Sequence, residues 1–140
     1  MFKKEDGKAP TNILIIEDEH DIRDVYVEVL EEAGFVVDQA KDGEEGMTKI
    51  KAGAWDLLLL DIMLPGRDGL KILNEMKNTP DLKKGPVVAL TNLNSDNIIQ
   101  EAFGAGADGY LIKSQVTPDK IVEEVNKFFN KEEEYPTLLN

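Results

Sequence analysis

Five polar side chains stand at the ends of short apolar runs in this 140-residue sequence: Glu17, Asp18, Asp61, Thr91 and Lys113. A carboxylate can act as a nucleophile and form an aspartyl phosphate. Three carboxylates that lie close together repel one another unless a cation sits among them, and such an oxygen-rich site suits Mg²⁺. An ammonium group can neutralise phosphoryl oxygens, and a hydroxyl can hydrogen-bond one of them. If the fold brings these side chains together, their chemistry is Mg²⁺-assisted phosphoryl transfer to a carboxylate.

The position of Asp61 is central to this interpretation. It follows the apolar run at 57–60 and opens the segment DIMLPGRDG at 61–69. A short apolar run without polar alternation, closed by Pro and Gly, is typical of a strand covered on both faces. Open α/β sheets bind their ligands at the carboxyl ends of such strands. Taken alone, Asp61 is better explained as a turn acid that caps the next helix. The polar residues at the ends of the other strands make a functional role the better explanation.

Strands and helices are predicted to alternate along the chain. Short apolar runs indicate strands at 13–16, 35–37, 57–60, 86–90 and 110–112. Apolar residues recur with helical spacing in five segments: Ile22, Val25, Tyr26, Val29, Leu30 and Ala33, ended by Gly34; Met47 and Ile50; Leu70, Leu73 and Met76, from Asp68; Ile98, Ile99, Ala102 and Phe103, capped by Ser95; and Ile121, Val122, Val125, Phe128 and Phe129, opened by Thr117 and Pro118. Five strand–helix units predict an α/β fold, with a five-stranded parallel sheet and helices on both faces.

The charge balance is acidic, with 28 acidic and 16 basic side chains and a formal net charge of −12. This argues against direct binding to nucleic acid, which needs a basic surface. The surplus acid either aids solubility or concentrates divalent cations. The sequence has no cysteine, which excludes disulfides and thiolate chemistry. Because no apolar run suits a membrane span or a signal peptide, we expect a cytoplasmic protein without membrane contact.

Four motifs resemble the receiver domain of response regulators in two-component signalling. They are Glu17-Asp18 after an apolar strand, the segment 61–69, Thr91 at a strand end, and YLIK at 110–113. Each motif is weak alone, but together and in this order they are strong. The resemblance covers residues 11–130 and implies that family's doubly wound, flavodoxin-like (βα)5 fold. We therefore expect a flexible tail at 1–10, a receiver domain at 11–130 and an acidic tail at 131–140.

The resemblance also implies a role for each residue that matches the family's motifs. Asp61 is the expected phosphoacceptor. Asp18 and Asp61 are expected to bind Mg²⁺ directly, with the backbone carbonyl of Met63 as a third ligand and Glu17 acting through a metal-bound water. Lys113 is expected to pair with the acceptor carboxylate and later with the phosphoryl group.

A conformational switch is the second implication of the resemblance. Thr91 is expected to move towards the phosphoryl oxygen and Tyr110 to turn inward behind it, which would remodel the face of the fourth helix, fifth strand and fifth helix. The expected partners are a histidine kinase or phosphotransfer protein and a downstream protein target, and the family also allows a phosphorylation-dependent homodimer. Few residues follow the last predicted helix, so we expect a stand-alone receiver, with a piece of a longer regulator as the open alternative. The resemblance implies a signalling domain and not an enzyme, beyond its own phosphorylation and dephosphorylation.

The sequence departs from the family at positions beside the site. Ser114 follows Lys113, where the family has proline after a cis peptide bond, so this bond is either trans or a costly non-proline cis bond. Asn92 follows Thr91, where the family has a small residue. Met63, two residues after the acceptor, and Leu93, two after Thr91, cannot orient a hydrolytic water by hydrogen bonding. We therefore predict a long-lived aspartyl phosphate.

Three other functions are less well supported by these motifs. A Mg²⁺-dependent phosphohydrolase of the haloacid-dehalogenase type carries a second Asp two residues after its nucleophile, where this chain has Met63. A pseudo-receiver would bind partners without phosphorylation, but the chain retains all five polar strand ends. GAGADG at 104–109 matches the dinucleotide fingerprint, yet that fingerprint needs a strand before it and a helix after it, and here the predicted order is reversed.

Simpler structural roles also remain for single residues. Glu17 and Asp18 suit the start of the first helix, because acids favour helix N-termini. Lys113 fits an ordinary surface lysine after a strand, and Tyr110 fits a packed strand aromatic. The only histidine, His20, is better explained as a solvated first-turn residue than as a phosphoryl carrier.

Overall fold

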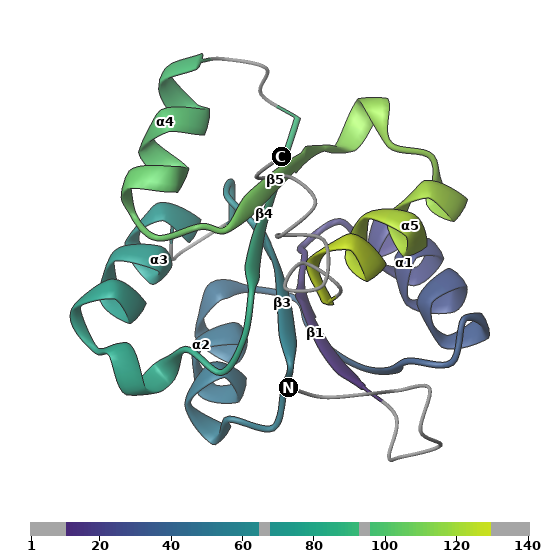
Figure 1. Cartoon of the computed structure of the whole chain (residues 1–140), viewed down its shortest axis with the longest axis horizontal. Coiled ribbons are helices and arrows are strands. Elements are labelled where there is room, and N and C mark those ends of the chain that lie inside the picture. Colours follow the sequence, from purple (N-terminus) through teal and green to yellow (C-terminus); the bar gives the residue numbers. More distant parts are fainter. Residues whose placement is uncertain (1–10, 65–67, 93–95, 130–140) are drawn as a thin grey trace, which may run out of the picture.

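Five apolar runs form one parallel sheet in the computed structural model, which describes residues 11–64, 68–92 and 96–129. The strands are β1 Asn12–Ile16, β2 Val36–Ala40, β3 Leu57–Asp61, β4 Val87–Thr91 and β5 Gly109–Ile112. Their order across the sheet is β2-β1-β3-β4-β5, and every neighbouring pair is parallel (Figure 1). All residues of β3 and β4 are buried, which explains why these runs lack polar alternation.

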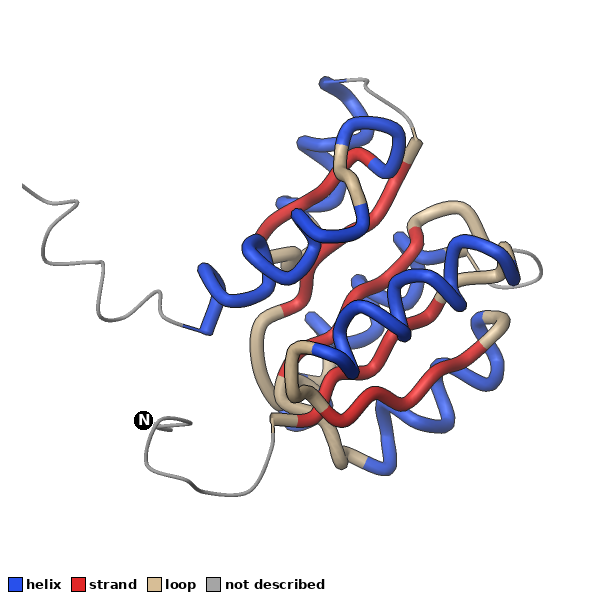
Figure 2. The backbone as a smooth tube through the Cα atoms, turned by 90° about the vertical axis from the view of Figure 1, so that its right-hand side faces the viewer, coloured by secondary structure: helices blue, strands red, loops and turns tan. Residues whose placement is uncertain are grey.

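Helices cover both faces of the sheet, as Figures 1 and 2 show. They are α1 His20–Glu32, α2 Gly43–Ala52, α3 Gly69–Asn78, α4 Asp96–Gly104 and α5 Pro118–Phe129, with short 3₁₀ turns η2 Pro80–Leu82 and η3 Lys113–Gln115. The fold is the predicted five-stranded, doubly wound α/β architecture. None of the helices in the described ranges is long and apolar enough to cross a membrane.

The side chains of the strands alternate between two hydrophobic cores. Leu58 and Leu60 of β3 point to the core that α2, α3 and α4 complete, whereas Leu57 and Leu59 point to the core beneath α1 and α5. Since successive residues of a strand face opposite sides of a sheet, both faces of β3 must be apolar. The buried central strand thus holds Asp61 at its carboxyl end.

The ends of the elements agree with the sequence in most places. Gly34, just after α1, has φ +101°, which is the left-handed conformation expected of a helix stop. The Asp68 carboxylate caps α3 by accepting from the Leu70 N–H at 2.7 Å. The segment 104–109 runs from the end of α4 to the start of β5, so it is the predicted turn and not a nucleotide-binding fingerprint. The predicted cap Ser95, Leu93 and both predicted tails lie outside the described residues.

Four sequence predictions of local structure were wrong in detail. The strand predicted at 35–37 is Val36–Ala40, an edge strand whose mostly exposed residues gave little apolar signal. Val25 was placed on the buried face of the first helix, but it is exposed and Val27 is buried instead. Phe103 was also expected to be buried and is exposed on α4, because Ala102 faces the core there. Ala33, predicted as the last residue of the first helix's buried face, is exposed after α1 ends.

Candidate functional site

A cluster of charged side chains lies at the carboxyl edge of the sheet. Asp61 ends β3, Glu17 follows β1 and Lys113 follows β5. The Lys113 Nζ lies 3.0 Å from Glu17 Oε1 and 3.2 Å from Asp61 Oδ2. Both carboxylates are almost fully buried, with relative exposures of 0% for Glu17 and 2% for Asp61. Three residues that are distant in sequence are therefore joined by buried ion pairs, as the strand order predicts.

Asp18 completes a set of three carboxylates suited to a metal ion. One oxygen each from Glu17, Asp18 and Asp61 lies within 4.8 Å of the others, and Asp18 is the least buried of the three. Carboxylate oxygens at this spacing, partly open to water, match the ligand preference of Mg²⁺. Lys113 supplies one positive charge against three negative ones, so the donor set fits a divalent cation.

The backbone beside Asp61 helps to fix its carboxylate. The Met63 N–H donates to Asp61 Oδ1 at 2.9 Å, while Oδ2 accepts from Lys113, so both acceptor oxygens are oriented. The Met63 side chain is 60% exposed and lines a shallow pocket with Asp18 and Asp68. Its backbone carbonyl as a metal ligand stays a prediction.

Burial and neighbouring charge shift the acid–base properties of this cluster. Burial raises the pKa of Asp61 to about 7, and the negative charge of Glu17 adds to this, although the Met63 N–H and Lys113 act in the opposite direction. Burial by itself would lower the pKa of Lys113. Its hydrogen bonds and charge interactions with Glu17 and Asp61 outweigh burial, so that pKa is raised and the ammonium stays charged. A cation beside Asp61 would favour its ionised form.

The two predicted switch residues lie at different depths. Thr91 is the buried last residue of β4, one position beyond the Leu90 that aligns with Asp61 in the neighbouring strand. Tyr110 of β5 is 37% exposed, and its ring packs edge-on against Phe103 of α4 with 5.7 Å between centroids. Tyr110 is therefore a partly exposed aromatic and not a core residue.

The peptide bonds of the described residues are all trans, which includes the bond between Lys113 and Ser114. Lys113 opens the 3₁₀ turn η3, and its side chain still reaches Asp61. The serine at 114 is thus compatible with the ion pair. Asn92 is exposed directly after β4.

Sequence reasoning missed three residues that support the site. Glu19 contacts Lys113 at 3.2 Å. Arg23 of α1 donates through Nη1 to the Glu17 backbone carbonyl at 2.8 Å and through Nε to Gln39 at 3.0 Å. Gly69 packs so closely on the backbone of Asp61 that a Cβ there would clash. These contacts depend on how separate elements meet. One signal was present in the sequence, the position of Glu19 directly after Glu17-Asp18.

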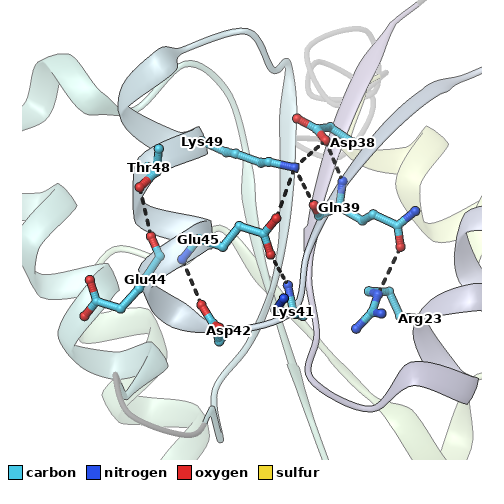
Figure 3. A network of polar contacts seen from close by, with 9 residues as sticks. All are labelled: Arg23, Asp38, Gln39, Lys41, Asp42, Glu44, Glu45, Thr48 and Lys49. Atoms are coloured by element: carbon cyan, nitrogen blue, oxygen red, sulfur yellow. Dashed lines mark hydrogen bonds and ion pairs between the residues drawn. The ribbon is translucent and has the colours of Figure 1, made fainter.

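A second polar network borders the site and anchors the edge strand (Figure 3). Lys49 of α2 reaches Asp38 at 2.8 Å, the Gln39 backbone carbonyl at 2.7 Å and Glu45 at 3.6 Å. Figure 3 also shows Arg23 meeting Gln39 from the other side. This network therefore links α1 and α2 through β2, and it contains no residue of the charged cluster.

An acid-rich site at the carboxyl edge of a five-stranded (βα)5 sheet defines the CheY-like class of α/β proteins. The chain belongs to the response regulator receiver domain family, whose model matches residues 13–126. The resemblance inferred from the motifs is therefore confirmed, and with it membership of a family of two-component signalling proteins. Mg²⁺ and an aspartyl phosphate are typical of this family.

Two regulators illustrate the similarity in sequence. The chain is 30% identical over 126 residues to the transcriptional regulatory protein ResD of Bacillus subtilis, covering 90% of this chain and 51% of ResD. It is 37% identical over 101 residues to HprR of Escherichia coli, covering 72% of this chain and 44% of HprR. The chain thus spans about half or less of the length of the curated relatives it matches.

Solved structures show the same similarity in fold. A CheY-like receiver domain protein of Methanospirillum hungatei superposes with a TM-score of 0.79 at 29% identity, covering 90% of this chain and 98% of that one. The chemotaxis protein CheY4 of Vibrio cholerae gives a TM-score of 0.78 at 26% identity, covering 86% and 99%. The fold match therefore extends over nearly the whole of both neighbours.

Proposed function

We propose that this protein is a phosphorylation-dependent signalling switch whose phosphoacceptor is Asp61. The observation that supports this best is the orientation of a buried carboxylate by two different donors, the Lys113 ammonium and the Met63 N–H. Receiver domains are signalling modules and not conventional enzymes. We further propose that residues 11–130 act as a self-contained receiver in the cytoplasm.

In the proposed reaction an Asp61 oxygen attacks the phosphorus of a phosphohistidine on a kinase or phosphotransfer protein. The new bond joins that oxygen to phosphorus, and the P–N bond breaks with its electron pair left on the imidazole. Lys113 stabilises negative charge on the phosphoryl oxygens. Mg²⁺ held by Asp18, Asp61 and the Met63 carbonyl, with Glu17 acting through water, would supply further charge stabilisation.

Signalling then follows from a change in the face made by α4, β5 and α5. Thr91 would hydrogen-bond the phosphoryl group, and Tyr110 would leave Phe103 and turn inward. The remodelled face would bind a downstream protein target, or a second copy of this chain. The partly exposed pair of Tyr110 and Phe103 supports this proposal because its rings are available to rearrange.

Intact-mass spectrometry after incubation with acetyl phosphate tests the acceptor and the metal together. We expect one phosphoryl adduct that needs Mg²⁺ and is absent from Asp61→Asn. Asp56→Asn is the matched control, because Asp56 lies just before the amino end of the same strand, where it caps the Asn12 N–H. This control should be labelled like the wild type.

The alternatives give different outcomes in the same experiment. A pseudo-receiver shows neither an adduct nor Mg²⁺ binding by calorimetry, whereas a phosphohydrolase consumes many equivalents of phosphodonor. Labelling of Asp61→Asn at the wild-type level would reject Asp61 as the acceptor.

A further inference from the structure

Among the residues that the structure describes, the Lys113 ammonium makes three contacts, and all of them are with carboxylates. Its Nζ lies 3.0 Å from Glu17 Oε1, 3.2 Å from Asp61 Oδ2 and 3.2 Å from Glu19 Oε1. A lysine ammonium has three hydrogens to donate. These three carboxylates therefore occupy its full donor capacity.

The three partners differ in how easily they can release the lysine. Glu17 and Asp61 are buried, and Glu17 Oε2 also accepts the Glu19 N–H at 2.9 Å, so moving either carboxylate leaves a buried charge without its cation. The Glu19 side chain is 53% exposed. Water can replace Lys113 as its partner at little cost, because exposed ion pairs contribute little to stability.

We propose that Glu19 is an exchangeable partner that restrains Lys113 before phosphorylation and releases it afterwards. This inference rests on the proposed function. A phosphoryl group on Asp61 presents new anionic oxygens to an ammonium whose three hydrogens face carboxylates of the described residues. The hydrogen that Asp61 Oδ2 accepts can pass to one phosphoryl oxygen, because the phosphorylated carboxylate has lost its charge. A second phosphoryl contact needs the hydrogen that Glu19 accepts, and water can solvate the Glu19 carboxylate once it is released. Glu19 is thus a positioning residue that acts through Lys113.

Two consequences for the reaction rate follow from this arrangement. The contact with Glu19 holds one Lys113 hydrogen away from the phosphoryl group, so it opposes the forward reaction. The Glu19 carboxylate also places a negative charge next to Lys113, where an anionic phosphodonor has to approach. Removing the Glu19 carboxylate should therefore speed phosphorylation, although a simple loss of support for the site would slow it.

The rate of labelling by acetyl phosphate with saturating Mg²⁺ tests this inference. We expect Glu19→Gln to be labelled about two- to fivefold faster than the wild type. Glu19→Asp keeps the charge but is one methylene shorter, so it should lose the contact and be labelled faster than the wild type, though less so than Glu19→Gln. Asp21→Asn removes the same charge from a fully exposed side chain that lies 3.4 Å from His20 Nδ1, and it should be labelled at the wild-type rate.

A second measurement reports the exchange directly. Beryllium trifluoride mimics a phosphoryl group on an aspartate, and the ¹³C chemical shift of the Glu19 carboxylate should move to that of a hydrated glutamate when it binds with Mg²⁺. The proposal is overturned if this shift is unchanged at saturation, or if Glu19→Gln is labelled no faster than the wild type. Equal acceleration in Asp21→Asn, or wild-type behaviour of Glu19→Asp, would assign the effect to charge alone.

The outcomes also separate this inference from the proposed function. If the wild type takes up neither the phosphoryl group nor beryllium trifluoride, the phosphoacceptor role itself fails and the exchange fails with it. If the wild type is labelled on Asp61 and the Glu19 variants are labelled at the same rate, only the role of Glu19 is rejected.

Discussion

The Asp61 carboxylate is held in an environment that disfavours its charge. Burial, together with the neighbouring charge of Glu17, raises the pKa of Asp61 from 3.8 to about 7. A carboxylic acid whose pKa is higher in the folded than in the unfolded state favours folding most while it is protonated. The ionised carboxylate that the proposed nucleophilic attack requires is thus the less stable form for the metal-free fold.

Stability of the metal-free protein should therefore depend on pH through Asp61. Its contribution is fully present below about pH 4, falls as pH rises towards 7 and is constant above that. Asp61→Asn removes this loss. The unfolding free energy of the variant should therefore rise relative to that of the wild type by about 1–3 kcal/mol as the pH increases from 4 to 8. Thermal unfolding of both proteins in a chelator checks this. A difference in unfolding free energy that does not vary with pH would contradict it.

Gly69 gives a second prediction at the residue scale. A Cβ at this position would lie 2.7 Å from the Ile62 Cα and would clash with the Asp61 backbone carbonyl. Gly69→Ala should therefore destabilise the fold by about 1–3 kcal/mol, measured by urea unfolding, and should slow labelling by acetyl phosphate. Gly104→Ala is the matched control, because nothing lies within 4 Å of its added Cβ. Equal unfolding free energies of the two variants would show that the backbone of Asp61 and Ile62 shifts at little cost to accommodate the added Cβ.

Among the secondary-structure elements, α4 and β5 are coupled by one aromatic contact. Phe103 meets Tyr110 at an interplanar angle of 85°, an edge-to-face geometry that contributes about 0.5–1.5 kcal/mol beyond area burial. The contact favours the outward ring of Tyr110. A switch that turns this ring inward must first break it.

Phe103→Ala should accordingly favour the inward ring before any phosphorylation. We expect a larger inward population in ¹⁹F NMR of protein with fluorotyrosine at Tyr110, and faster labelling by acetyl phosphate. Val36→Ala, which removes an exposed apolar side chain on the opposite edge strand, should change neither. An unchanged ¹⁹F spectrum in Phe103→Ala would indicate that the contact does not restrain Tyr110.

The elements also explain which features the sequence could predict. Leu57–Leu60 and the other central runs reveal buried strands because both faces are covered, and parallel pairing then places Asp61 and Lys113 at one edge. The extent of edge strand β2 and the exposure of Phe103 could not be predicted from apolar runs, because both depend on which surfaces the neighbouring elements cover. The contacts of Glu19 and Arg23 join separate elements, and no local pattern encodes them.

For the whole molecule, the formal net charge of −12 includes the three carboxylates of the predicted metal site. A ligand that binds only the folded state stabilises it, by about 1.4 kcal/mol at ten times its Kd. Mg²⁺ should therefore raise the Tm of the wild type in a concentration-dependent way. It should have little effect on Asp18→Asn.

Matched ionic strength separates specific binding from general screening. Sodium chloride at the same ionic strength should produce a smaller shift in Tm, and Asp21→Asn should respond to Mg²⁺ like the wild type because its side chain lies outside the carboxylate set. Equal shifts with both salts would assign the effect to screening of the acidic surface.

The ion pair between Glu17 and Lys113 spans 96 positions of the chain. During synthesis on the ribosome, β1 and β3 emerge long before the lysine that neutralises the acids at their ends. A chain that stops short of η3 holds the acidic residues without their lysine. The proposed phosphoacceptor site is therefore complete only when β5, the last strand, has joined the sheet, so the ion pair that prepares the site also reports that the sheet is fully assembled.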